Sequence, residues 1–386
     1  MSRAARRFRF LLTVLGCFGG GSLYGWSGYL PAVRVEFDVG NAAASMVFSL
    51  VLVSFTFGVL IGPILLAKIQ PRLRLPFVAG LAALSLVVSG ASTSFAGFAI
   101  AYGTLFGFAS GALYNHAISV ASASDAAILL VPVSVAAFGL GGAVFGPVNV
   151  WLTATGWGLW SMMPAMVSLA GTAVAALALK VPPEAPVAQP LAPIPFVKPD
   201  KTIAILWIIF ATGSCSGLIV LGFAAQFLPA AEGGIGLISL AIFLAALGNG
   251  LGRLSSALTA SWFGPARGIS LALMLSLISL TCLLGATAPG LLVGLLFMVA
   301  FAYGQLAATM PLLVKSQVKD AAFSGSFGWV FTGWGVAGLL GPWGAGGLFD
   351  ATGSLKVPIV VCILLLGLSF WLVLPFAKQG QDTETR

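Results

Sequence analysis

Long apolar segments, separated by short polar loops, dominate the chain. A membrane-spanning α-helix needs about 20 apolar residues, and each segment is about that long. Twelve can be placed, at residues 8–33, 43–67, 75–94, 96–121, 126–153, 156–180, 202–229, 235–260, 267–287, 290–315, 322–348 and 355–377. They are continuously apolar, whereas the strands of an outer-membrane barrel alternate apolar and polar residues. The sequence therefore predicts an all-α polytopic membrane protein.

The composition excludes most classes of soluble protein. Charged residues make up only 7% of the chain, against roughly 25% in soluble domains. The net charge of +8 does not indicate a nucleic-acid partner, because the basic residues are spread over short loops and tails. The four cysteines lie far apart in apolar segments, so we expect neither a metal site nor a disulfide. No cofactor motif and no set of catalytic residues is apparent, and we expect no enzyme activity.

Basic residues are distributed unevenly between the two sides of the predicted membrane helices. If the N-terminus is cytoplasmic, 15 of the 18 Lys and Arg residues lie on the cytoplasmic side, two lie outside, and one lies within a segment. Membrane helices orient themselves according to this asymmetry. It predicts that both termini are cytoplasmic, in a multi-pass protein of a bacterial inner membrane.

The chain divides into two related halves. A proline-rich stretch at 181–201 lies between the sixth and seventh segments and is predicted to be an extended cytoplasmic linker. It separates a six-helix bundle at 1–180 from a second at 202–386, which ends in a short cytoplasmic tail. The stretches 62–75 and 252–268 occupy corresponding places, and each combines a glycine-bearing helix end with a short basic loop. Parallel six-helix repeats of this kind build a large group of secondary transporters.

A single cation, Arg253, lies inside an apolar segment. A guanidinium stays charged in proteins, and a charge at the bilayer centre costs about 2.5–3.5 kcal/mol on insertion scales. All ten acidic residues lie in loops, in tails or at helix ends, so none is expected to pair with Arg253. One explanation is that the side chain reaches to the cytoplasmic interface. The other is that it binds an anion, because a planar guanidinium fits a carboxylate bidentately.

Three polar residues are candidates for the same site. Asn249 lies one helical turn before Arg253 and either orients the guanidinium or only packs between helices. His116 is the only histidine, and because it titrates near neutral pH it is a candidate substrate ligand and proton carrier. The alternative is a hydrogen bond between helices. Asn115 is also a candidate ligand, although it points about 100° away from His116, so at most one of the two fully faces a cavity.

Aromatic residues near the expected centre are further candidates for the substrate pocket. They are Tyr24, Trp26, Tyr114, Tyr303, Phe331 and Trp334. Tyr24, Tyr303 and Trp334 are favoured because they fall well inside the first, tenth and eleventh segments. A tyrosine hydroxyl can bond a carboxylate, and the rings can enclose a short alkyl chain.

Three stretches carry a resemblance to a known family: GSLYGWSGYLP at 21–31, NGLGR at 249–253 and FGWVFTGWGVAGLLGP at 327–342. With its twelve segments and two halves, the chain resembles the major facilitator superfamily. Within it, the stretches are similar to the monocarboxylate transporter and oxalate/formate antiporter group. Bacterial lactate-type members also carry a pair like Asn115–His116. The resemblance implies that Arg253 binds the substrate carboxylate.

Two positions depart from the pattern of that group. Asn249 stands where animal monocarboxylate transporters carry an Asp implicated in proton coupling. Trp334 stands where oxalate transporters carry a lysine that binds a second carboxylate. The resemblance therefore implies a substrate with one carboxylate and leaves the coupling open between symport and exchange.

The sequence thus predicts a monomeric secondary transporter of a lactate- or pyruvate-like monocarboxylate. It would work by alternating access, with proton symport as the first prediction and anion exchange as the alternative. A drug or sugar carrier of the same fold would not need Arg253 to bind an anion. A channel would not need two related halves.

Overall fold

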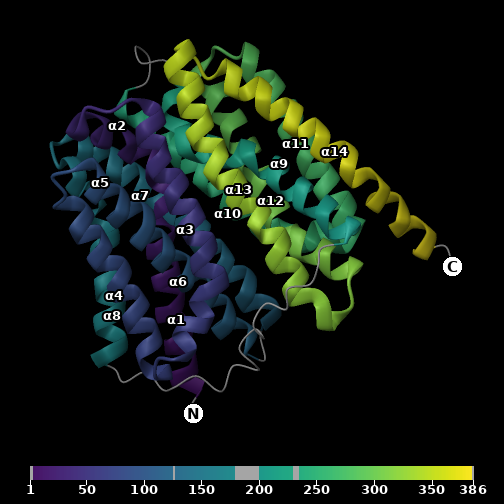
Figure 1. Ribbon diagram of the computed structural model, residues 1–386, viewed down its shortest axis with the longest axis horizontal. Coiled ribbons are helices and arrows are strands. Elements are labelled where there is room, and N and C mark those ends of the chain that lie inside the picture. Colours follow the sequence, from purple (N-terminus) through teal and green to yellow (C-terminus); the bar gives the residue numbers. More distant parts are fainter. Residues whose placement is uncertain (1–2, 125–126, 179–199, 229–233, 385–386) are drawn as a thin grey trace.

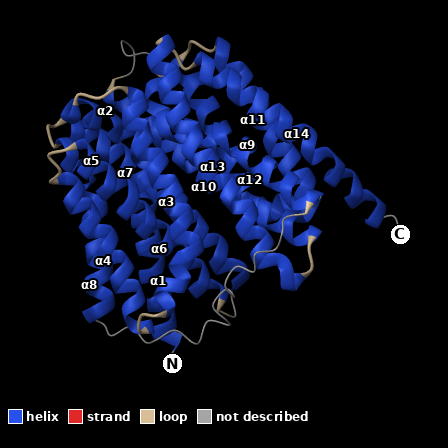
Figure 2. Cartoon of the chain, in the orientation of Figure 1, coloured by secondary structure: helices blue, strands red, loops and turns tan. Residues whose placement is uncertain are grey.

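The structure is a computed structural model that describes residues 3–124, 127–178, 200–228 and 234–384. Within these ranges the chain forms helices and short connections, with no strand (Figure 2). Ten of the helices in these ranges are long and apolar enough to cross a membrane. The predicted linker at 181–201 lies outside the described residues except for its last two positions. There Asp200 caps the next helix by accepting a hydrogen bond from the backbone N–H of Ile203.

Six helical segments make up the first half of the chain, and some of them are composed of more than one helical type. They are α1 (Arg3–Gly20) with η1 (Gly21–Gly25) and α2 (Trp26–Phe37); α3 (Asn41–Ala67); α4 (Pro71–Gly90); α5 (Phe95–Phe98) with η2 (Ala99–Phe106) and α6 (Gly107–Ser122); α7 (Ala127–Ala154); and η3 (Gly158–Met162) with α8 (Met163–Ala178). The first segment thus changes to a 3₁₀ turn at GSLYG, and η2 is a π-helical stretch.

The second half adds six more segments. They are α9 (Lys201–Phe223) with η4 (Ala224–Phe227), α10 (Ile235–Phe263), α11 (Pro265–Gly285), α12 (Pro289–Gln317), α13 (Asp320–Thr352) and α14 (Lys356–Glu384). All twelve predicted segments are therefore helical in the described chain. Most boundaries agree with the prediction to within a few residues, and the last helix continues beyond 377 to Glu384.

The boundary between the third and fourth segments differs from the prediction. Helix α4 ends at Gly90 instead of continuing to 94. The hydroxyl of Ser94 accepts a hydrogen bond from the backbone N–H of Gly97 and so caps the next helix. A serine at this position satisfies an N–H group that has no partner within the helix. The polar residues before α5 therefore form a turn.

The two halves lie side by side (Figure 1). In the figure the first half, in purple and blue, occupies the left, and the second half, in green and yellow, occupies the right. Helix α7 packs against α10 across the boundary, and α3 packs against α13. Two helix pairs, each with one helix from either half, therefore form the main interface between the bundles.

One side of the molecule is closed by hydrogen bonds between the halves. Successive segments run in opposite directions, and we call the side on which α1 begins the terminal side and the other the distal side. Near the distal side, the Ser27 hydroxyl accepts a hydrogen bond from the backbone N–H of Ala225 (2.7 Å) and donates one to the Gln226 side chain (3.3 Å). The hydroxyl of Ser49 also accepts from the backbone N–H of Trp343 (3.1 Å).

A helix cap supplied by the other half reinforces this closure. Helix α3 begins after Gly40, which has no side chain to cap it. Asp350, near the end of α13, takes that role. Its Oδ1 accepts from the backbone N–H and the side-chain amide of Asn41 (3.0 and 2.8 Å), and its Oδ2 accepts from the backbone N–H of Ala42 (2.7 Å). A negative charge is favourable at a helix N-terminus, so this contact holds the distal ends of α3 and α13 together.

Candidate functional site

A cavity of about 430 Å³ lies between the two halves. Its lining includes Tyr24, Arg253 and Trp334, which lie well inside their helical segments. It also includes Val131, near the start of α7, and Pro311, late in α12. Both of these lie toward the terminal side, so the cavity extends from the middle of the molecule toward that side. The distal side is the one that the hydrogen bonds described above close.

Arg253 is the charged residue of this cavity, and its side chain is only 8% exposed. Its Nε donates to Asn249 Oδ1 (3.1 Å), its Nη1 donates to the Tyr114 hydroxyl (3.5 Å), and its Nη2 donates to the Tyr24 hydroxyl (3.3 Å). Both tyrosines come from the opposite half of the protein. The guanidinium is thus held between the halves and does not extend to the helix end, which disfavours the interfacial explanation.

The polar groups around Arg253 contain more donors than acceptors. Arginine and tryptophan side chains only donate hydrogen bonds. The Trp334 indole donates to the Tyr303 hydroxyl (2.7 Å), which also interacts with the Tyr24 hydroxyl. A hydroxyl that accepts from these donors keeps its own proton to donate onward. No Asp or Glu is among the residues that line the cavity. An anion is therefore the group that would complete this network.

Two glycines leave room for the tyrosines of the site. A methyl group on Gly142 of α7 would lie 2.6 Å from Cβ of Tyr24, closer than atoms can approach. A methyl group on Gly217 of α9 would overlap the side chain of Tyr303. The absence of a side chain at these two positions lets the helices approach closely enough to fix the tyrosines, as small residues do in membrane helix interfaces.

The structure brings most of the predicted site residues to the cavity. Arg253, Tyr24, Tyr114, Asn115, Phe331 and Trp334 line it. The Asn115 side chain is engaged on both ends, since its amide donates to the Val59 carbonyl (3.1 Å) and its oxygen accepts from Ser119 (3.2 Å).

Four predicted residues do not line the cavity, and one of them, Trp26, is fully buried. Asn249 is fully buried, and its Oδ1 accepts the hydrogen bond from Arg253 that one of the two interpretations of the sequence requires. Tyr303 is buried and contacts the site through Trp334 and Tyr24. His116 is 7% exposed and is not among the lining residues. A role of His116 as a direct substrate ligand is therefore not supported by its position, whereas a role in coupling stays a prediction.

Several aromatic rings that line the cavity were not predicted from the sequence, namely Phe55, Phe210, Phe323 and Phe327. A signal for part of this set was present, because residues 323, 327, 331 and 334 fall on one face of a helix at spacings of three and four. In an apolar segment this face is not distinguished from the lipid-facing side, so the pattern did not indicate a cavity.

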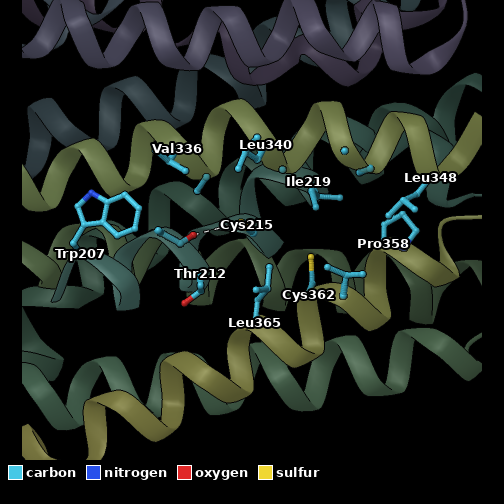
Figure 3. Close-up of a pocket in the computed structure, with 16 residues that line it drawn as sticks. Trp207, Thr212, Cys215, Ile219, Val336, Leu340, Leu348, Pro358, Cys362 and Leu365 are labelled. Atoms are coloured by element: carbon cyan, nitrogen blue, oxygen red, sulfur yellow. Dashed lines mark hydrogen bonds between the residues drawn. The ribbon is translucent and has the colours of Figure 1, made fainter. Parts of the chain in front are cut away.

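A second cavity, of about 330 Å³, lies between α9, α13 and α14. Figure 3 shows it extending from Trp207 at one end to Leu348 and Pro358 at the other. No charged side chain lines it, and the thiol of Cys215 is bonded to the Ala211 carbonyl (3.4 Å). This cavity is therefore unsuited to an anion. Among the described residues, no group of three His, Cys, Asp or Glu side chains is arranged to hold a metal ion.

Comparison with known proteins identifies the fold. No protein-family model matches the sequence, and no curated protein sequence matches it. Among solved structures, the nucleoside transporter NupG matches with a TM-score of 0.71 and 16% identity, over 95% of this chain and 98% of that one. A mutant of the same transporter matches with a TM-score of 0.70 over the same shares. The chain has a transporter fold of the major facilitator type.

This finding confirms the predicted fold class of twelve helices in two six-helix bundles. At 16% identity the similarity extends to the fold and not to the substrate. The finer resemblance to the monocarboxylate and oxalate/formate group stays a prediction.

Proposed function

We propose that this protein is a secondary transporter of small organic anions that carry one carboxylate. The observation that carries the proposal is the environment of Arg253. Its guanidinium is buried at a cavity between two transporter halves, bonded only to neutral groups from either half. A buried cation without a counter-ion is costly, and a carboxylate offers both the charge and the acceptor oxygens that the site lacks.

The number of cationic groups supports the restriction to one carboxylate. Arg253 is the only Lys or Arg among the cavity-lining residues, and Trp334 provides no second charge. A second carboxylate on the substrate would therefore be buried against apolar rings. Burying an unpaired carboxylate is strongly unfavourable, so a dicarboxylate should bind poorly.

Alternating access is the mechanism we propose. The cavity extends to the terminal side, and the halves are joined on the distal side through Ser27, Ser49 and Asp350. In the transport cycle the distal contacts would open while the helices close over the cavity at the terminal side. From the distribution of basic loop residues we propose that the terminal side is cytoplasmic, in a bacterial inner membrane, and that one chain forms the transporter.

Proton symport is the coupling we propose, with His116 as the group that carries the proton. Its position behind the cavity lining favours an indirect effect on the site over direct contact with the substrate. Anion exchange is the alternative, since no carboxylate lines the cavity to carry a proton.

The test is uptake of radiolabelled carboxylates into proteoliposomes that contain the purified full-length protein. We expect uptake of a monocarboxylate such as lactate or phenylacetate, no uptake of the corresponding amides, and stimulation by an inwardly directed proton gradient. Uptake that is independent of the proton gradient but requires a preloaded internal anion would indicate exchange. Uptake of a neutral nucleoside or sugar with no carboxylate uptake would contradict the proposal.

A further inference from the structure

A row of aromatic rings begins at the binding partners of Arg253. Tyr114, which accepts a hydrogen bond from Arg253, has its ring centroid 5.5 Å from that of Phe55. The Phe55 ring in turn lies 5.5 Å from that of Trp334. Tyr114 and Phe55 come from the first half of the protein and Trp334 from the second. The rings therefore form a continuous wall across the boundary between the halves, directly beside the guanidinium.

The row continues along α13 toward the terminal side. Trp334 and Phe331 stack with centroids 5.5 Å apart, Phe331 lies 5.8 Å from Phe327, and Phe327 lies 5.9 Å from Phe323. Phe210 of α9 joins the row at 6.4 Å from Phe331. All of these rings line the cavity. A molecule that moves between Arg253 and the terminal side thus passes along aromatic side chains.

The remaining polar groups of the lining are already engaged within the protein. The Ser256 hydroxyl donates to the Arg253 carbonyl (2.7 Å), and both ends of the Asn115 side chain are bonded. The donors available to a ligand are therefore concentrated at Arg253 and its two tyrosines. Beyond that point, the lining is mainly apolar.

We infer that the substrate is a monocarboxylate with an aromatic body, of the phenylacetate type. Its carboxylate would bind at Arg253, and its ring would lie among Phe55, Phe331 and Trp334. Ring pairs at such separations are favoured beyond the burial of their surface. This inference rests on the proposed function and restricts its substrate class.

The aromatic lining of the cavity disfavours substrates that lack an aromatic ring or carry several hydroxyl groups. A sugar or nucleoside would bury several hydroxyl groups against rings that offer them no hydrogen bonds, which is unfavourable. A three-carbon acid would use the donors at Arg253 but leave the aromatic wall without contacts. A cavity of about 430 Å³ is large enough for a ligand with a ring, since ligand pockets typically measure about 300–1,000 Å³.

The inference is tested by equilibrium binding to the purified full-length protein in nanodiscs, measured by calorimetry. The probes are phenylacetate, cyclohexylacetate, acetate and phenylacetamide. We expect phenylacetate to bind about 70-fold more tightly than acetate, the ratio expected when roughly 100 Å² of ring surface leaves water. Cyclohexylacetate should bind about fivefold more weakly than phenylacetate, since it lacks the ring–ring contribution.

A pair of variants tests whether the aromatic rings of the cavity cause the preference for phenylacetate over acetate. Phe331→Leu should lower the ratio of phenylacetate to acetate affinity about fivefold. Phe57→Leu is the matched control, because Phe57 is 52% exposed and does not line the cavity. Its affinity ratio should equal that of the wild type.

The outcomes separate this inference from the proposed function. If acetate and phenylacetate bind equally and both need Arg253, the aromatic inference is wrong and the anion site stands. If phenylacetamide binds as tightly as phenylacetate, the proposed anion site itself is wrong. A Phe331→Leu protein with an unchanged affinity ratio would also overturn the aromatic inference.

Discussion

Removing the carboxylate of Asp350 should favour opening of the distal side. Asp350 accepts three hydrogen bonds at the N-terminus of α3, which Gly40 leaves uncapped. Loss of a helix N-cap typically costs about 1 kcal/mol, and the exposure of this carboxylate limits any additional charge effect. In the alternating-access cycle that we propose, these bonds break when the halves separate on the distal side. Asp350→Ala should therefore shift the equilibrium toward the distally open state by about 1 kcal/mol, or about fivefold.

The shift can be measured by pulsed electron spin resonance between labels on the two halves. Val35 at the end of α2 and Lys356 at the start of α14 are exposed on the distal side. Cysteines at these positions can be labelled once Cys282 is replaced, since the other three cysteines are buried. We expect the population with longer distances to increase about fivefold relative to the closed population.

A control variant distinguishes loss of the helix cap from a general effect of removing a negative charge on the distal side. Glu36 is an exposed acid near the same side and is not part of the cap. Glu36→Ala should leave the distance distribution unchanged. If Asp350→Ala also leaves it unchanged, or if both variants shift it equally, the cap does not hold the distal side closed.

Three further predictions concern the cap and the groups behind the cavity wall. Burial raises the pKa of Asp350, but hydrogen bonds from Ala42 and Asn41, with nearby Arg34, outweigh it and lower the pKa below its usual range. The stabilising effect of Asp350 is therefore present above pH about 4 and lost only below it, so the difference in spin-label distances between the wild type and Asp350→Ala should be the same at pH 8 and pH 5. Asn249→Asp places a carboxylate beside Arg253 that competes with the substrate carboxylate, so calorimetry at pH 7 should show weaker substrate binding, and unchanged binding would contradict the role of Asn249. Gly217→Ala should displace Tyr303 and weaken binding about tenfold, as expected for overpacking, whereas Gly171→Ala, where nothing lies within 4 Å of the added methyl, should bind normally.

The sequence predicts the fold well because hydrophobicity and loop charge are properties of single segments. Arg253 could be identified for the same reason, since one charge in an apolar run requires a partner wherever the helix packs. Tyr24 followed from its depth within its segment, and Tyr114 from its place near the expected centre. The structure places both on Arg253, from the opposite half.

The remaining features depend on which helix faces meet. The wall of rings on α13 has a helical spacing, but in a membrane protein the lipid-facing side is equally apolar. The cap between Asp350 and Asn41 joins residues 309 positions apart, and no local pattern relates them. The placement of His116 behind the lining, and of Asn115 in it, depends on the rotation of α6, which a uniformly apolar segment does not specify.

The central claim, that Arg253 binds the carboxylate of the substrate, is tested most directly by a thermodynamic cycle. Binding of phenylacetate and phenylacetamide is measured by calorimetry for the wild type, for Arg253→Gln, and for the control Arg267→Gln, which removes an arginine that does not line the cavity. A charged hydrogen bond contributes about 1.5–3 kcal/mol. Arg253→Gln should therefore weaken binding of the acid about 10- to 150-fold and leave binding of the amide unchanged. Equal effects on the acid and the amide, or no effect on either, would contradict the claim.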